Sequence, residues 1–269
     1  MKIKIFALLL CSSIQICMAQ DKFTITGNLP QAGDEKMVML HYINSEGKNA
    51  KDSALVKQGK FSLSGTTAFG NKAYLSMMSV NRDPKTRMRQ DSKDFYLEKG
   101  SYKVIGKDSV YKASITGTEV QADYIAYTAL TQKLLAHWRD ISDRFAKVYY
   151  AKPRDTVKVK IIQAEAKPVF AALEAKLDSF IFAHPDSYLT ADLIHENRMA
   201  VIDVVKFDPY YTALSKRVLA GFTGKKITDK YMKAKQFAVG KMIDFTIPDV
   251  NGTAFKLSSL KGKYVLVDF

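Results

Sequence analysis

Cysteine is scarce in this chain of 269 residues, which contains only Cys11 and Cys17, both close to the N-terminus. If that end is removed, no thiol remains. The rest of the chain then forms no disulfide, no cysteine-ligated metal site and no thiol nucleophile. A chain of this length without disulfides must be held together by its apolar core.

The first nineteen residues have the pattern of a secretory signal peptide. Lys2 and Lys4 form a short basic start, Ile5–Leu10 begins an apolar run, and Ala19 is a small residue at the expected cleavage site. Because polar residues interrupt the apolar run, it is too short for a membrane anchor. We therefore expect residues 1–19, with both cysteines, to be removed on export to the periplasm or cell envelope.

Acidic residues are outnumbered by basic ones, and the formal charge of +14 falls to +12 without Lys2 and Lys4. The lysines and arginines are spread through the sequence, without the interleaved aromatic residues on which single-stranded nucleic acids stack. Export also argues against nucleic acid as a partner. We expect solvated basic faces and at most a weak attraction to anionic envelope surfaces.

Few residues offer catalytic chemistry. Asp34/Glu35 and Asp140/Asp143 are carboxylate pairs among basic residues, and Asp140 has the spacing of a helical ion pair with Arg144. Because the four histidines are far apart in sequence, we predict no metal site. They are His41, His137, His184 and His195. We name no catalytic, cofactor-binding or metal-binding residue and expect no cofactor.

Two short motifs have structural explanations. Gly221–Lys226 looks like a phosphate-binding loop but lacks the GxxxxGK[ST] spacing, so we predict the end of a helix and a loop there. Asn251-Gly252-Thr253 matches a glycosylation sequon, but Asn-Gly is first of all a turn signal.

Between about Phe23 and Gly117 the sequence predicts short strands separated by turns. Apolar and polar residues alternate at Phe23–Gly27 and Gly59–Gly65, and Glu98-Lys99-Gly100 has the composition of a hairpin turn. Further strands are expected at Met37–Tyr42, Ala73–Met78, Phe95–Leu97, Tyr102–Val104 and Ala113–Ile115. With no helical period among them, these strands predict an antiparallel sandwich or a partial barrel.

From Glu119 the apolar residues are separated by threes and fours, which predicts a long helix that ends near Pro153. Trp138 lies at the centre of its apolar face. This face is most simply a packing surface. It is also the one place where the residues present offer a groove for a ligand.

A second helix is expected from about Asp155 to Ala183. Pro168 lies inside it and should kink it or begin a new helix at Lys167. Ser187 is the expected N-cap of a third helix, roughly Tyr188–Met199.

A fourth helix is expected to begin at Asp208-Pro209 and to end at Gly221. A basic, amphipathic run follows over Thr228–Phe237. The middle of the chain is therefore predicted to be entirely helical.

The last thirty residues, Gly240–Phe269, read GKMIDFTIPDVNGTAFKLSSLKGKYVLVDF. They predict a short strand around Asp244–Ile247, a turn at Asn251-Gly252, a second strand that ends at Ser258-Ser259, and an apolar strand Tyr264–Phe269. The nearly continuous apolar residues of the last strand are typical of a sheet centre covered on both faces.

This segment resembles the opening of the thioredoxin-like domain in TlpA/ResA-type, AhpC/TSA-related thiol:disulfide oxidoreductases of the bacterial envelope. In that family a similar lead-in runs directly into a Trp-Cys-x-x-Cys motif. The resemblance implies reactive cysteines within a few residues after Phe269, so we expect a truncated or fragmentary member. It also implies protein disulfides and dithiols as partners, attacked by a low-pKa thiolate. Without those cysteines, this chain is expected to have no disulfide reductase activity.

The N-terminal region resembles the domain of unknown function that precedes thioredoxin-like domains in many envelope proteins. The matching residues are Phe23–Gly27, Asp52-Ser53-Ala54, Gly59-Lys60-Phe61 and Gly65. No catalytic role comes with this resemblance.

The sequence therefore predicts an α+β protein with an antiparallel, sandwich-like β domain at 20–118, a helical region at 119–237, and the first strands of a thioredoxin-like α/β domain at 238–269. The leading function is the N-terminal portion of an exported thiol:disulfide oxidoreductase. Two alternatives stay open, a non-enzymatic envelope binding module and a fragment of an AhpC/TSA-type peroxidase. The oligomeric state is open as well.

Overall fold

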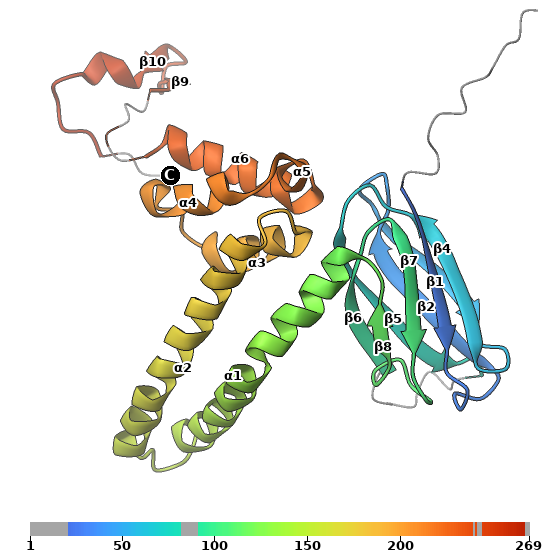
Figure 1. Cartoon of the computed structure of the whole chain (residues 1–269). Helices are drawn as coiled ribbons and strands as arrows, with labels where there is room; N and C mark the ends of the chain where they lie inside the picture. The colour runs from blue at the N-terminus through green and yellow to red at the C-terminus, as the bar shows by residue number, and fades with distance from the viewer. Residues whose placement is uncertain (1–20, 82–90, 239, 241–243, 267–269) are drawn as a thin grey trace, which may run out of the picture. The chain divides into compact units, whose positions relative to one another are not determined.

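The computed structural model describes residues 21–81, 91–238, 240 and 244–266. The chain divides into two compact units, Met1–Tyr124 and Ile125–Phe269. Strands dominate the first unit and helices the second (Figure 1), so the fold class is α+β, as the sequence predicts. The expected signal peptide and its cleavage site lie outside the described residues.

One sheet of the first unit has the strand order β4-β1-β7-β8. Its strands are β1 (Lys22–Asn28), β4 (Lys60–Thr66), β7 (Gly100–Ile105) and β8 (Ser114–Thr116). β1 is antiparallel to β4, with Phe23 opposite Gly65, but parallel to β7, with Ile25 opposite Tyr102. The parallel β1–β7 pair departs from the wholly antiparallel arrangement that the sequence predicts.

The second sheet is antiparallel throughout and has the order β3-β2-β5-β6. Its strands are β2 (Lys36–Ile43), β3 (Asn49–Leu55), β5 (Asn71–Ser79) and β6 (Asp91–Leu97). The predicted hairpin at Glu98-Lys99-Gly100 is wrong, because β6 pairs with β5 in this sheet whereas β7 pairs with β1 and β8 in the other. The turn instead carries the chain from one sheet to the other.

Both sheets contribute apolar side chains to a single core. Alternate residues of a strand point to opposite faces, and the burial pattern of β1 and β4 alternates accordingly. The fully buried core residues come from both sheets and include Ile25, Val38, Leu40, Leu75, Phe95, Leu97 and Val104. The sandwich prediction is therefore confirmed.

The first turns of helix α1 (Glu119–Tyr149) pack against the β-sandwich. The Gln121 side chain is 3% exposed. Its Oε1 accepts a hydrogen bond from the backbone N–H of Tyr96 at 2.8 Å, and its Nε2 donates to the backbone oxygen of Ile115 at 2.8 Å. Gln121 thus satisfies backbone groups of β6 and β8, both of which end a sheet.

Helices α1 and α2 (Thr156–Ala183) form a hairpin (Figure 1). Asp155 caps α2 by accepting a hydrogen bond from the N–H of Lys158 at 3.0 Å. No new helix begins at Lys167, because α2 continues unbroken through Pro168. Proline deprives the carbonyl of Ala164 of its helical partner, and both residues are exposed, so that carbonyl faces solvent.

Four shorter helices complete the helical region: α3 (Tyr188–Arg198), α4 (Val204–Ala213), α5 (Lys216–Leu219) and α6 (Phe222–Gln236). They contribute the buried side chains Leu189, Ile194, Phe207, Val218, Ile227 and Tyr231. Among the described helices, none is both long and apolar enough to cross a membrane.

Two predicted helix boundaries in this region are wrong. The helix α4 is capped by Asp203, whose carboxylate accepts hydrogen bonds from the N–H groups of Val205 and Lys206, so Pro209 lies inside the helix. Gly221 is the N-cap of α6 and does not end a helix. The residues that look like a phosphate-binding loop therefore form the first turns of α6.

Near the C-terminus, β9 (Thr246–Pro248) and β10 (Ala254–Lys256) pair as an antiparallel hairpin. Asp249 Oδ1 accepts hydrogen bonds from the N–H groups of Asn251 at 2.8 Å and Thr253 at 2.9 Å. Gly252 has a φ of 81°, in the left-handed region that favours glycine. The predicted turn at Asn251-Gly252 is confirmed.

The segment after β10 differs from its prediction. A short 3₁₀-helix, Leu257–Leu260, follows the hairpin. Residues 264–266 form no strand, and Tyr264 and Leu266 are fully exposed. The prediction of an apolar central strand is wrong for these three residues, and the rest of that strand lies outside the described residues.

Candidate functional site

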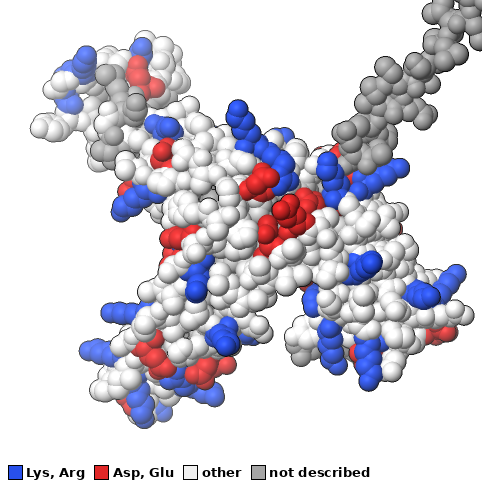
Figure 2. Space-filling view, in the orientation of Figure 1, with Lys and Arg blue, Asp and Glu red and all other residues white. Residues whose placement is uncertain are grey.

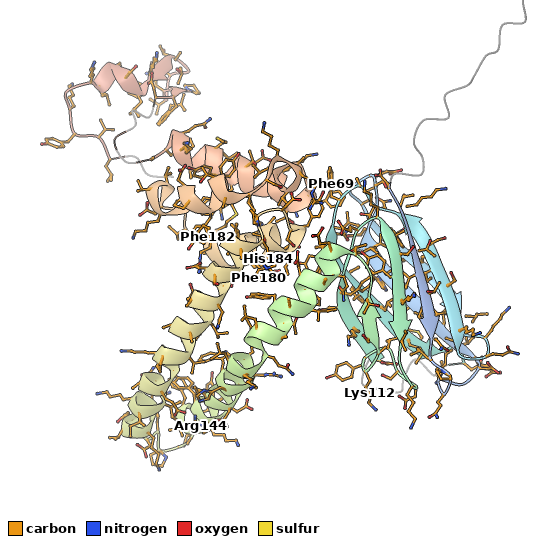
Figure 3. All side chains as sticks on the ribbon, viewed as in Figure 1. Phe69, Lys112, Arg144, Phe180, Phe182 and His184 are labelled. Carbon is orange, nitrogen blue, oxygen red and sulfur yellow. The ribbon has the colours of Figure 1, made fainter. Side chains whose placement is uncertain are left out.

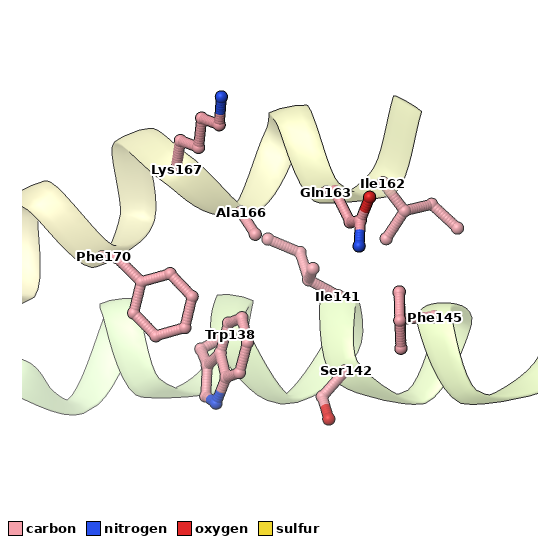
Figure 4. Close-up of a pocket in the computed structure, with 9 residues that line it drawn as sticks. All are labelled: Trp138, Ile141, Ser142, Phe145, Ile162, Gln163, Ala166, Lys167 and Phe170. Atoms are coloured by element: carbon pink, nitrogen blue, oxygen red, sulfur yellow. The ribbon is translucent and has the colours of Figure 1, made fainter. Parts of the chain in front are cut away.

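The helical hairpin contains a cavity of about 420 Å³ between α1 and α2 (Figure 4). Its apolar walls are formed by Trp138, Ile141, Phe145, Ile162, Ala166 and Phe170. Ser142, Gln163 and Lys167 are its polar lining residues, and none of the nine is acidic. Pockets of this size and composition are typical of small-molecule sites.

The spacing of apolar residues along the two helices creates this cavity. Ile141 packs with Ile162, Ala166 and Val169 in a buried seam between the helices. The ring centroids of Trp138 and Phe170 lie 4.2 Å apart. Because Ala166 is small and faces Ile141 (Figure 4), it leaves space beside the seam that a larger side chain would occupy.

The other flank of the seam is closed by ion pairs. The Arg144 guanidinium, labelled in Figure 3, donates to both carboxylate oxygens of Glu165, at 2.6 and 2.9 Å, and to Asp140 at 2.8 Å. The predicted Asp140–Arg144 pair is confirmed. His137 Nε2 lies 3.5 Å from Glu165. Hydrogen bonding to Arg144 holds the pKa of the Glu165 carboxyl below its usual value.

A second polar cluster joins α2, α3 and α4. The Arg198 side chain, 15% exposed, contacts Glu174 at 2.6 Å and Asp178 at 2.8 Å. The Tyr210 hydroxyl donates to Asp178 at 3.0 Å. Each charged group in this cluster has an opposite charge beside it, so the arrangement is that of a structural ion-pair network.

The histidines make separate contacts and do not form one cluster. The His41 ring stacks on Tyr74 with centroids 4.4 Å apart, and the His184 ring stacks on Phe180 at 4.2 Å (Figure 3). His195 is exposed on α3. Within the described parts of the chain, no group of three or more His, Cys, Asp or Glu side chains is placed to hold a metal ion.

The carboxylate pair Asp34/Glu35 lies in the β-sandwich unit and accepts hydrogen bonds from neighbouring turns. Asp34 Oδ1 accepts a hydrogen bond from the N–H of Gln58 at 3.1 Å, and Glu35 Oε2 accepts one from Asn81 at 3.3 Å. Both carboxylates line a second cavity of about 540 Å³. These hydrogen bonds indicate that the two carboxylates stabilise loops.

Basic side chains are distributed over the surface. On the face shown in Figure 2, Lys and Arg occur on every part of the molecule and do not gather in one patch. Some of the lysines have acidic neighbours, such as Lys72, which lies 3.5 Å from Asp94 on the adjacent strand. The face in Figure 2 therefore shows no basic stripe of the kind that follows a nucleic acid backbone.

Sequence reasoning identified one wall of the α1–α2 cavity and missed the other. Trp138 and its helix face were predicted as a packing surface that offers a groove. The α2 wall was not predicted, although Ile162, Ala166 and Phe170 recur every four residues, which places them on one side of a helix. That spacing was the available signal.

The chain is thus an α+β protein with an N-terminal β-sandwich. In a comparison with protein families, residues 23–124 match the model of a domain of unknown function, DUF4369. This agrees with the expected domain of unknown function at this end of the chain. The matched range includes the first turns of α1, through which Gln121 and Tyr124 contact the β-sandwich.

No curated protein matches the chain. Among solved structures, the human-specific toxin intermedilysin is similar over 37% of this chain and 23% of its own length, with 11% sequence identity and a TM-score of 0.18. A likeness at this TM-score carries no argument about fold or function.

Proposed function

We propose that this chain is the N-terminal portion of an exported, thioredoxin-like thiol:disulfide oxidoreductase that exchanges disulfides with proteins of the cell envelope. The observation that carries the proposal is the sequence of Gly240–Phe269, with its resemblance to the lead-in of TlpA/ResA-type domains. Within it, β9, the Asp249 turn and β10 have the strand–turn–strand order expected of that lead-in. The DUF4369 match supports it further, because a domain of unknown function precedes such domains in the family resembled.

In this proposal the reactive thiols come after Phe269. A Cys-x-x-Cys pair at a helix N-terminus would provide a thiolate that attacks a substrate disulfide, and the second cysteine would resolve the mixed disulfide. The residues present here would carry and orient that centre or recognise its substrates. They include no thiol nucleophile after residue 19, because the two cysteines are Cys11 and Cys17.

The coding sequence beyond Phe269 tests the proposal directly. A Trp-Cys-x-x-Cys continuation is expected, and the protein that contains it should reduce insulin disulfides. Replacing both of those cysteines by serine should abolish turnover. Residues 20–269 alone should show none, so turnover by that fragment would contradict the role given to the thiols. A stop codon directly after Phe269 would also refute the proposal, and a lone cysteine would favour an AhpC/TSA-type peroxidase.

A second candidate function is a non-enzymatic binding module of the envelope. The observation that favours it is the apolar cavity between α1 and α2, which is formed entirely by described residues and requires no thiol. The two functions are compatible within one protein, since a binding site in the helical region places no demand on a thioredoxin-like domain.

A further inference from the structure

We propose that the α1–α2 cavity binds a free anionic amphiphile, a long-chain carboxylate, with the alkyl chain between the helices and the carboxylate at the Lys167 rim. This inference goes beyond disulfide exchange and does not depend on it. It rests on the shape of the cavity, the chemistry of its walls and the charge at its edge.

Aromatic side chains lie at both ends of the cavity. Trp138 and Phe170 are in contact at one end, and Phe145 and Ile162 lie at the other (Figure 4). A partner helix would need a continuous groove with anchoring positions over several turns. A cavity of about 420 Å³ is suited to a small molecule instead.

The walls favour an alkyl chain. Six of the nine lining residues are apolar, and Ile141, Ile162 and Ala166 are buried in the seam. An unbranched hydrocarbon gains free energy when it leaves water and requires no hydrogen-bonding partner. It also adapts its shape to the narrow space beside Ala166.

The edge of the cavity favours a negative head group. Lys167 is a lining residue at the α2 edge of the cavity, and its side chain extends away from α1 into solvent (Figure 4). A flexible lysine reaches a carboxylate at the rim without being buried. Lys160 is also exposed and lies seven residues earlier, on the same side of α2. On the other flank of the seam, Asp140 and Glu165 are paired with Arg144. Glu174, one turn beyond Phe170 on α2, is paired with Arg198.

Trp138 makes this proposal measurable, because it is the single tryptophan of the chain and forms part of the cavity wall. The purified chain is titrated with palmitate below its aggregation concentration while Trp138 fluorescence is recorded. We expect a saturable change in emission with one site per chain. The uncharged analogue 1-hexadecanol should bind more weakly, and the cationic hexadecyltrimethylammonium more weakly still.

Matched variants separate the two halves of the site. Lys167→Gln should weaken palmitate binding roughly two- to fivefold, the size of an exposed charge contact, and leave hexadecanol binding unchanged. Lys176→Gln removes the same charge from an exposed position of α2 that does not line the cavity, and should change neither. Ala166→Leu should weaken both ligands at least about tenfold by filling the space. Ser142→Leu, at an exposed position on the α1 side, is a second blocking variant that leaves the buried seam intact.

Several results would overturn the proposal. One is an absence of saturable fluorescence change up to the solubility limit of palmitate. Another is equal affinity for the cationic and anionic amphiphiles, which would remove the role of Lys167. Unchanged binding in both blocking variants would place the ligand elsewhere. A dimer in sedimentation, together with Trp138 emission typical of a buried indole in the absence of ligand, would assign the cavity to a second copy of the chain.

Discussion

Replacing Gln121 by alanine tests the connection between α1 and the β-sandwich. The wild-type side chain is buried and makes two hydrogen bonds of 2.8 Å, one from the N–H of Tyr96 and one to the carbonyl of Ile115. Alanine is compatible with the helix but cannot make either hydrogen bond, so the N–H of Tyr96 and the carbonyl of Ile115 lose their side-chain partner. A buried polar backbone group without a partner costs about 1–3 kcal/mol, so the two groups together cost about 2–6 kcal/mol.

We expect a loss of about 3 kcal/mol in the free energy of unfolding, toward the lower part of that range, because water can enter the space left by the amide. For a domain of this size, each kcal/mol lowers the melting temperature by about 4–8 °C. Urea denaturation followed by circular dichroism measures the change. The matched control is Gln132→Ala, at an exposed position of the same helix, which should alter the free energy of unfolding by less than about 0.5 kcal/mol.

A Gln121→Glu variant gives the same test a pH dependence. A protonated carboxyl can accept from Tyr96 and donate to Ile115, whereas the ionised form loses its donor and places a charge in a buried site. Its folded-state pKa is therefore raised above the unfolded value of about 4.3. The stability of this variant should be closest to wild type below about pH 4 and fall as the pH rises through the folded pKa. The reasoning would be refuted if Gln121→Ala lowered the free energy of unfolding by less than about 1 kcal/mol. It would also be refuted if the stability of Gln121→Glu did not change with pH.

Three further predictions concern other parts of the chain. Burial raises the pKa of Tyr102 from 10.0 to about 12. The stability that this shift contributes is complete below pH 10 and should be lost as the pH rises through 12, so Tyr102→Phe should make the alkaline fall in stability less steep in urea titrations. Gly59→Ala should lower the free energy of unfolding, measured by urea denaturation, more than Gly33→Ala does. Both glycines have positive φ, but a Cβ on Gly59 would lie 2.6 Å from Pro30, whereas Gly33 has open space. Equal losses would contradict the predicted clash. The amide protons of β9 and β10 should exchange faster than those of β1, since an isolated two-stranded hairpin is marginally stable; comparable protection would mean that the hairpin packs on a partner.

Most of the β-sandwich could be predicted from the alternation of apolar and polar residues, but β3 could not. Its residues alternate between exposed and partly buried, and none of the seven is fully buried. As an edge strand pairing only with β2, it buries little and carries Lys51 and Asp52. Edge strands are often polar for this reason, so their sequences resemble loops.

Helix existence could be predicted from the sequence, but helix starts were less certain. The sequence predicts that α4 begins at Asp208-Pro209, whereas its observed N-cap is Asp203. Asp203 is the cap because its carboxylate reaches two backbone N–H groups, and starting there places Phe207 inside the helix, where it is buried. The choice depends on the burial of Phe207, which a local signal does not contain.

The candidate site was half predictable for a similar reason. The apolar face around Trp138 follows from the spacing within α1 alone. Which flank of the seam stays open depends on the Arg144–Glu165 pair, which joins residues of different helices. Neither that pair nor the contact between Trp138 and Phe170 can be inferred from one helix at a time.

The position of β1 has a consequence for the order in which the chain acquires its structure. This first strand lies inside its sheet, between β4 and its parallel partner β7. During synthesis, β7 emerges only after nearly the whole unit has been made, so the earliest strand waits for one of the latest. Pairings this distant in sequence are slow to form. We therefore expect the sandwich to fold in one late step, after β7 has been made, and its core residues to stay exposed to solvent until then.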